Sequence, residues 1–262
     1  MAYTHLLLRY GELFLKGKNR GYFEKKLCEN IKNITKISTV SRIQGRLIID
    51  FFPNHHTLTR VFGLVSYSPA VRVEKDVEKI KMAALTLVAS RTGTFRVETQ
   101  RSDKSFPIPS PRFNAQLGRS IEENTPLQFS LHHPDLVLGI EINQDGVYLF
   151  WEKIPCFGGI PTGIEGKVVL LLENDASILA GLLMMKRGCN ILPVNHGEED
   201  LSLLEKYSPA SLRWHTLIDS GIPVVSSQTF ESYKEYDYPL VFRPLIAFTQ
   251  AEIRVQLQEF KK

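Results

Sequence analysis

Residues 168–188 read VVLLLENDASILAGLLMMKRG, and this stretch decides the fold of the C-terminal part of the chain. Its first five residues are apolar without alternation, which is typical of a parallel strand buried on both faces. Residues 176–187 have helical character, and Gly188 follows as a helix terminator. A buried strand that leads directly into a helix predicts that a doubly wound α/β domain begins here.

The rest of the C-terminal part keeps this alternation of short strands and helices. Strands are predicted at 190–194, 222–225 and 240–242, and helices at 203–206, 211–219 and 250–260. Residues 155–166, PCFGGIPTGIEG, are rich in glycine and proline and therefore mark a connection between domains.

Two smaller α+β modules precede that connection. In the first, a strand at 5–8 leads to a helix capped by Asn19 and then to a strand at 45–51. The second combines strands, two helices and a hairpin. Its strands are predicted at 71–73, 94–99, 136–142 and 147–151, with a helix at 77–88 and another around Leu117.

Charge is distributed unevenly along the 262 residues, whose net charge is +4. Residues 1–120 carry 21 Lys and Arg against 9 Asp and Glu, whereas residues 121–262 carry 11 against 19, so the two parts stand at +12 and −8. Clustered cations favour phosphate backbones, so the first part is expected to face a polyanion. The alternative is a solvated basic surface with no such partner.

The composition is that of a folded globular protein, with 43% hydrophobic and 23% charged residues. The three cysteines lie far apart without a CxxC pair, which argues against a disulfide framework and a thiolate zinc site and suits a reducing cytoplasm. The N-terminus lacks an export pattern, and the apolar uncharged stretch 176–185 is too short to span a membrane, as are the slightly longer uncharged stretches such as 61–71. We therefore expect a cytoplasmic protein with no membrane partner.

Two groups of cations are candidates for contacting RNA. The loop RSDKSFP at 101–107 and the cation after it can hold phosphate oxygens through charges, hydroxyls and free helix amides. Phe106 can stack on a base or anchor the loop on the core. The second group lies on and before the first helix and could also be an ordinary solvated face. The residues predicted to bind RNA are Lys16, Lys18, Arg20, Lys25, Lys26, Arg101, Ser102, Lys104, Ser105, Phe106 and Arg112.

Several collinear segments resemble the ThiI family of tRNA 4-thiouridine synthetases: RYGELFLKGKNRGYFEKKL at 9–27, RSDKSFP at 101–107, HPDLVLGIEINQDGVYLFWEKIP at 133–155, GGIPTG at 158–163 and VVLLLENDASILAGLLMMKRG at 168–188. The resemblance implies α+β ferredoxin-like and THUMP domains that hold tRNA, followed by an α/β PP-loop domain with a Rossmann-like sheet. In that family the last domain adenylates uridine 8, so that persulfide sulfur can displace the activated oxygen. The implied division is a ferredoxin-like domain at 1–56, a THUMP domain at 57–154, a linker at 155–166 and a PP-loop-like domain at 167–262.

The sequence departs from the family where the chemistry should occur. The family signature SGGxDS aligns with residues 172–177, LENDAS, in which both glycines are replaced and Ser177 is retained. Carboxylates at Glu173 and Asp175 would each oppose a phosphate charge by about 1 to 4 kcal/mol at 4 Å. We therefore interpret the nucleotide site as lost and Asn174 or Asp175 as a helix cap. The alternative is that these carboxylates hold Mg²⁺ bridged to phosphate.

The parts needed for sulfur transfer are also missing. Residues 207–224 contain no cysteine, and Cys189, at the start of a strand, is interpreted as a small buried hydrophobe. By resemblance, a degenerate nucleotide site would comprise Leu170, Leu171, Ser177 and Gln228, but the glycine expected nine residues before Gln228 is Asp219. The 95 residues from Val168 onward predict a truncated domain.

Three functions follow from these observations. The first is a tRNA-binding scaffold, non-catalytic by itself, whose partner, a sulfur donor or thiolation enzyme, supplies the chemistry. The second is an ATP-dependent tRNA uridine 4-sulfurtransferase with a rebuilt site or a second subunit. The third is a small-molecule binder that keeps the α/β cleft. We expect no cofactor, with ATP and Mg²⁺ bound only if the altered loop still functions, and the resemblance also admits a homodimer.

Overall fold

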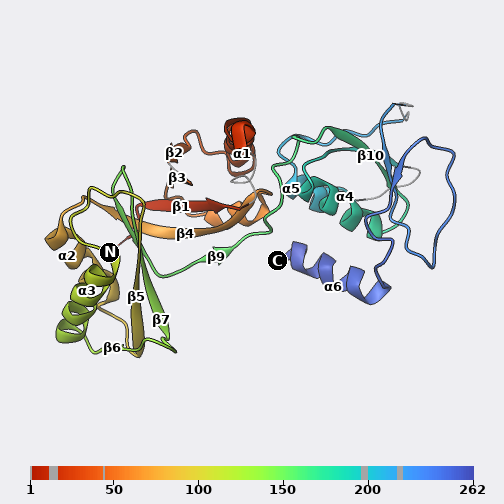
Figure 1. The fold of residues 1–262 in the computed structure, drawn as a ribbon. Helices are drawn as coiled ribbons and strands as arrows, with labels where there is room; N and C mark the ends of the chain where they lie inside the picture. Colours follow the sequence, from red (N-terminus) through yellow and green to blue (C-terminus); the bar gives the residue numbers. More distant parts are fainter. Residues whose placement is uncertain (1, 12–16, 44, 196–199, 217–220) are drawn as a thin grey trace. The chain divides into compact units, whose positions relative to one another are not determined.

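The computed structural model describes the chain apart from residues 1, 12–16, 44, 196–199 and 217–220 (Figure 1). It divides into two compact units, each interrupted in sequence. The first comprises Met1–Arg9, Thr39–His55 and Ser66–Pro155, and the second comprises Tyr10–Ser38, His56–Val65 and Cys156–Lys262. The domain boundaries implied by the sequence stay predictions.

A nine-stranded sheet forms the first unit, in the order β2-β3-β1-β4-β8-β7-β5-β6, with β9 paired to β4. Antiparallel pairs join β1 to β3 and β7 to β8, whereas β5 runs parallel to β7. The strands are β1 (His5–Tyr10), β2 (Ser41–Ile43), β3 (Arg46–Asp50), β4 (Leu64–Val73), β5 (Thr94–Arg101), β6 (Gln128–Phe129), β7 (Leu136–Ile142), β8 (Val147–Phe150) and β9 (Ile154–Pro155). The predicted hairpin is confirmed as β7 and β8.

Helices α2 (Val77–Val88) and α3 (Ser110–Asn124) cover one face of this sheet (Figure 1). Their apolar residues pack with those of β5, β7 and β8 in one buried cluster. Asp76 caps α2, because its side chain accepts a hydrogen bond from the amide of Lys79 at 2.9 Å. The opposite face of β5, β7 and β8 carries no helix of this unit among the described residues. Side chains such as those of Val137, Glu141 and Phe150 lie on it.

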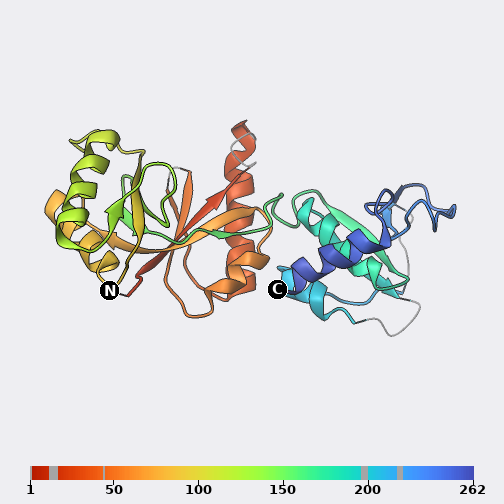
Figure 2. The same cartoon turned by 90° about the horizontal axis from the view of Figure 1, so that it is seen from below.

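The second unit contains α1 (Arg20–Thr35), the short 3₁₀ helix η2 (His55–Arg60, of which His55 belongs to the first unit) and a four-stranded parallel sheet in the order β11-β10-β12-β13. Helix α6 runs along α4 (Figure 2), and both contribute to the apolar cluster of this unit. The elements after α1 and η2 are β10 (Lys167–Leu172), α4 (Ala176–Lys186), β11 (Asn190–Asn195), α5 (Ser202–Tyr207), β12 (Val224–Val225), β13 (Val241–Phe242) and α6 (Gln250–Lys261). The predicted class, α+β modules followed by a doubly wound α/β region, is confirmed.

The glycine- and proline-rich segment is an ordered part of the second unit. The amide of Gly163 donates to the carbonyl of Gly188 at 2.8 Å, and the side chain of Asn30 donates to the carbonyl of Thr162 at 2.9 Å. Gly159 has a φ of +80°, and a Cβ there would lie 2.3 Å from the carbonyl oxygen of Lys186. The segment therefore packs tightly between α1 and the end of α4.

Two local predictions are wrong. Residues 211–216 are not helical, and His215 instead forms a parallel bridge with Val194; the remainder of the predicted helix lies largely outside the described residues. Asn19 stands at the start of α1, but its side chain makes no capping hydrogen bond. At α4 the N-cap position is Asp175, whose side chain makes no capping hydrogen bond, whereas the side chain of Asn174 accepts from the amide of Ala176 at 2.9 Å.

Candidate nucleic-acid interface

The loop after β5 is held in place by the first of its predicted RNA-binding residues. Nη1 of Arg101 donates to the carbonyl oxygen of Phe106 at 2.7 Å and to that of Ile108 at 3.3 Å. These bonds close the loop onto the end of its own strand. The main contact of Arg101 is therefore with the protein backbone.

Phe106 does not stack on a base. Its side chain is 2% exposed and packs edge-on against Phe113, with the ring centroids 5.3 Å apart. The prediction of base stacking is wrong because the ring is buried in the core beneath α3, and the alternative of a loop anchor is the one observed.

Lys104 and Arg112 are the exposed cations of this loop that have no hydrogen bond or ion pair among the described residues. By contrast, Lys75 is paired with Asp103 at 2.6 Å. That lysine and the hydroxyl of Ser105 lower the pKa of the Asp103 carboxyl. The hydroxyl of Ser102 donates to the carbonyl of Ile142 at 3.3 Å.

The second group of predicted residues lies at α1, in the other unit. Lys18 and Lys25 are exposed and make no ion pair among the described residues. Arg20 is 2.7 Å from Glu24, and Lys26 is 3.7 Å from Glu29, so these two cations are partly neutralised. Lys16 lies outside the described residues.

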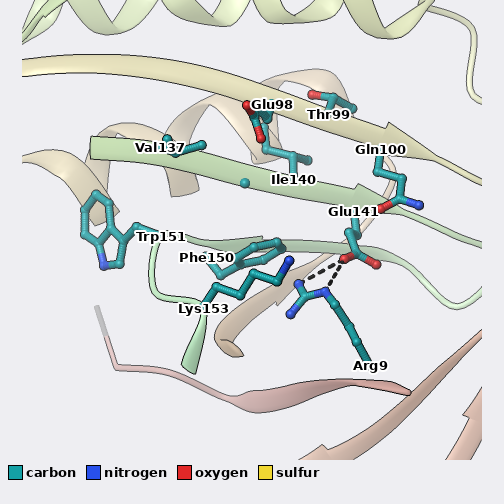
Figure 3. A pocket seen from close by; sticks show the side chains of 11 residues that line it. Arg9, Glu98, Thr99, Gln100, Val137, Ile140, Glu141, Phe150, Trp151 and Lys153 are labelled. Carbon is teal, nitrogen blue, oxygen red and sulfur yellow. Dashed lines mark hydrogen bonds and ion pairs between the residues drawn. The ribbon is translucent and has the colours of Figure 1, made fainter. Parts of the chain in front are cut away.

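A cavity of about 460 Å³ opens on the helix-free side of the first unit's sheet (Figure 3). The ring of Phe150 lies over Gly139, where a Cβ would come within 2.4 Å of the ring, and the guanidinium of Arg9 lies 4.6 Å from the ring centre. The lining residues are Arg9, Glu98, Thr99, Gln100, Val137, Gly139, Ile140, Glu141, Phe150, Trp151 and Lys153. An aromatic ring beside cations is the usual arrangement for holding an unstacked base.

Sequence reasoning missed this cavity. The available signal was the period of two along β7 and β8: Val137, Gly139 and Glu141 point away from the helices, as do Tyr148 and Phe150. A glycine among these alternate residues marks a place where another group approaches the backbone closely.

A buried ion cluster lies at the edge of the cavity. Glu141 is 2.9 Å from Arg9 and 2.7 Å from Arg46, and Arg9 also donates to the hydroxyl of Ser68 at 2.9 Å. Arg9 and Glu141 are only 8% and 7% exposed, and burial lowers the pKa of Arg9. Two guanidinium groups share one carboxylate, so the cluster keeps a net positive charge.

The loop between β10 and α4 hydrogen-bonds to itself. The buried hydroxyl of Ser177 accepts from the amides of Glu173 at 3.0 Å and Asn174 at 3.3 Å, and it donates to the hydroxyl of Ser227 at 3.1 Å. In a phosphate-binding loop such amides point at the ligand. Here they are already engaged by a side chain of the same loop.

The carboxylate of Glu173 is engaged in the same place. It accepts hydrogen bonds from the hydroxyl of Tyr236 and from that of Ser226, the latter at 3.1 Å. Burial and the bond to Glu173 raise the pKa of Tyr236. The loop thus presents a bound carboxylate where a phosphate group would need free donors.

The other residues of the predicted nucleotide site are also internal. Leu170 and Leu171 are 0% and 4% exposed, and Gln228 is 5% exposed, with its side-chain oxygen accepting from Nε of Arg243 at 2.9 Å. Together with the missing glycine cradle, these contacts do not fit ATP.

The three thiols are buried or partly buried. Burial raises the pKa of Cys156 to about 12, and burial with the charge of Glu165 raises that of Cys189. Cys28 is partly buried in α1. Within the described ranges no cluster of three or more His, Cys, Asp or Glu could hold a metal ion, and no helix is long and apolar enough to cross a membrane.

Two family models match the chain, the ThiI ferredoxin-like domain at residues 5–68 and the THUMP domain at residues 74–152. A probable tRNA sulfurtransferase of Natranaerobius thermophilus is 40% identical over 251 residues, covering 86% of this chain and 61% of that relative. The chain therefore spans less than two thirds of that relative's length.

Two crystal structures have the same fold. That of PH1313 from Pyrococcus horikoshii gives a TM-score of 0.85 at 30% identity and covers 99% of this chain and 100% of its own. That of a 4-thiouridine synthetase–RNA complex with bound ATP gives 0.81 at 25% identity and covers 98% and 85%.

Proposed function

The chain belongs to the ThiI family, and from this premise we propose that it holds tRNA while leaving ATP-dependent activation of the nucleoside to a partner. The THUMP domain is a tRNA-binding domain, and the 4-thiouridine synthetase of the same fold was crystallised with RNA. The proposed contacts are phosphate contacts from free cations and base contacts in the sheet cavity.

The phosphate contacts are assigned to four of the predicted cations that have no hydrogen bond or ion pair within the described part of the chain. These are Lys104 and Arg112 in the first unit and Lys18 and Lys25 in the second. Unpaired surface cations release counterions when they meet phosphates, which supplies most of the sequence-independent affinity for RNA. Arg101 and Phe106 contribute indirectly, because they hold the loop that carries Lys104.

The proposal of a non-catalytic role rests on one observation, the hydrogen bonds from the amides of Glu173 and Asn174 to Ser177. A pyrophosphate would have to displace this hydroxyl and also approach the carboxylate of Glu173. The high pKa of the Cys156 and Cys189 thiols adds to the argument, because a persulfide carrier needs an accessible thiolate. A thiolation enzyme or sulfur donor would then act on the tRNA held here.

The test measures the binding of two ligands, tRNA and MgATP, to the full chain. We expect tRNA to bind with an affinity that falls steeply as salt rises, and millimolar MgATP to give neither calorimetric heat nor a change in melting temperature. Saturable ATP binding would favour the alternative, a tRNA sulfurtransferase with a rebuilt site. Absence of tRNA binding at low salt would refute the proposal as a whole.

The matched variants locate the contacts. Lys104→Gln with Arg112→Gln is expected to weaken tRNA binding and to reduce the slope of log K against log salt by roughly 1 to 2. The control, Lys79→Gln with Lys262→Gln, removes the same charge from lysines already paired with Glu74 and Glu259. Equal effects of the two pairs would show that net charge, rather than this loop, determines binding.

A further inference from the structure

A second and smaller cavity, of about 40 Å³, lies in the first unit next to the one in Figure 3 and shares Gln100 and Glu141 with it. It is lined by Arg46, Gln100, Ser102, Glu141, Ile142 and Asn143. These residues come from β3, from the end of β5 and the loop after it, and from the end of β7 and the turn that follows. The cavity is too small for a base, and it lies directly beside the proposed RNA-binding loop.

Asn143 has a buried donor without a partner. The residue is 5% exposed, and its side-chain oxygen accepts from the amides of Asp145 at 2.9 Å and Gly146 at 3.2 Å. These two bonds fix the orientation of the amide group, so that Nδ2 is on the side away from the turn. Nδ2 is buried with no hydrogen-bond partner among the described residues. A buried donor left unpaired is costly, and an acceptor entering the cavity would satisfy it.

The charge around the cavity favours an anion. Arg46 is held by Glu141 at 2.7 Å, and its Nη2 also donates to the side-chain oxygen of Gln100 at 3.0 Å. This bond uses only the oxygen of the Gln100 amide, so the NH₂ group of the same amide can donate to another acceptor. Glu141 already accepts from both Arg9 and Arg46, so its single negative charge is outnumbered.

From these contacts we infer that the cavity binds one phosphate group of RNA, with Asn143 Nδ2 and the guanidinium of Arg46 as donors. The inference rests on the proposed RNA binding and adds a specific subsite to it. Gln100 is exposed and lies at the mouth, so its side chain is the one that moves to admit the oxygens. Ser102 adds a hydroxyl whose present bond, at 3.3 Å, is long and readily exchanged.

Two sources could supply the phosphate, a terminal 5′ phosphate or a phosphodiester of the backbone. The chemistry of recognition is the same, because both present oxygens that accept hydrogen bonds. The two are separated by measuring one RNA hairpin with a 5′ phosphate and with a 5′ hydroxyl. A preference for the phosphorylated form that disappears in the variant below assigns the terminal group. Equal loss for both forms assigns a phosphodiester.

The decisive variant is Asn143→Asp. It keeps an oxygen for the amides of Asp145 and Gly146 and replaces the unpaired donor by a charged acceptor. We expect about tenfold weaker binding of the hairpin in at least one of its two forms, since a hydrogen bond to a charged group is lost. The control Gln258→Glu makes the same change of charge on an exposed residue of α6 and should change affinity by less than twofold.

A second variant distinguishes a lost phosphate contact from a loss of folding. Ser102→Ala removes a donor without adding charge and should weaken hairpin binding about threefold while leaving the melting temperature unchanged. If the wild-type chain binds the hairpin and both variants bind it equally well in either form, the subsite does not exist. If the wild-type chain binds no RNA, the proposed function has failed, which is a different outcome.

Discussion

The hydroxyl of Tyr236 donates a hydrogen bond to the carboxylate of Glu173, across 63 residues of sequence. This contact ties the segment after β12 to the loop between β10 and α4. In a nucleotide-binding domain of this class, ligand phosphates are held at the carboxyl ends of the strands, where the two segments meet. In this chain the carboxylate of Glu173 occupies the hydrogen-bond donors of Tyr236 and Ser226 there.

Restoring the family signature in the loop between β10 and α4 should restore nucleotide binding there. The triple variant Glu173→Gly, Asn174→Gly, Ala176→Asp removes the carboxylate held by Tyr236 and returns flexibility to the two amides. We expect weak saturable MgATP binding by calorimetry for this variant and no binding for the wild-type chain. Glu173→Gln, which removes the charge and keeps the side chain and the loop backbone, is the control. If the control binds ATP as well as the triple variant, charge rather than backbone conformation closes the site.

Replacing Ser177 by alanine should destabilise the second unit. The variant leaves two partly buried amides without their acceptor, and each such loss costs at most about 1 to 3 kcal/mol. Chemical denaturation should show a lower free energy of unfolding, whereas Ser41→Ala, at an exposed strand position, should differ little from wild type. An unchanged stability of Ser177→Ala would mean that water or another group takes over both amides.

Two glycine substitutions should have opposite effects. In Gly139→Ala the new methyl group meets the ring of Phe150, so the ring must move, with a loss of about 1 to 3 kcal/mol in stability and weaker RNA binding. In Gly21→Ala nothing lies within 4 Å of the new methyl group, and the helix should gain up to about 1 kcal/mol. Thermal unfolding and RNA titration of both proteins check this. Loss of RNA binding by Gly21→Ala would show that RNA approaches the backbone at Gly21 itself, between the contacts proposed for Lys18 and Lys25.

Glu141 should matter far more to stability than a similar exposed glutamate. Glu141→Gln leaves Arg9 and Arg46 without their shared carboxylate, and breaking a buried ion pair in this way costs about 3 to 5 kcal/mol. Glu98→Gln removes a carboxylate that is paired with Arg96 on the surface, which is worth about 0 to 1 kcal/mol. Equal stabilities of the two variants would show that the cluster is hydrated.

The Cys156 thiol should be unreactive in the folded protein. With a pKa of about 12, roughly one thiol in ten thousand is ionised at pH 8, so alkylation of Cys156 should be slow, and urea should accelerate it. The raised pKa also makes stability depend on pH. The contribution of the buried neutral thiol is complete below about pH 9, the ordinary value, and is lost as the pH rises towards 12. Peptide mapping after alkylation identifies the thiol, and rapid labelling without urea would contradict the burial.

Much of the fold was predictable because short sequence patterns determine its elements. The β7–β8 hairpin follows from alternating apolar residues around an Asp-Gly turn, and β10 follows from an uninterrupted apolar run. The first residues of β4 were missed because Ser66, Ser68 and Pro69 disfavour a strand. In the structure Ser68 is buried and receives a hydrogen bond from Arg9, a partner 59 residues away that no local pattern reveals.

The candidate site was predictable only in part, for the same reason. Lys104 and Arg112 were identified from charge and loop composition, and the structure leaves them exposed. Phe106 has the composition of a stacking residue, but whether a ring faces solvent or the core depends on the helix that covers it. The unpaired amide of Asn143 depends on which of its atoms the turn uses, which composition does not specify.

The tight packing of Gly159 against the end of α4 also limits how the protein can be shortened. Helix α1 is encoded near the N-terminus, yet its Asn30 is bonded to Thr162, and Gly163 is bonded to the end of α4. A chain cut at the glycine- and proline-rich segment would therefore leave Leu27 and Ile31 of α1 without part of their surroundings. Helix α1 is thus not separable from the C-terminal elements of its unit, and an engineered fusion that exchanges those elements must carry its own counterpart to α1.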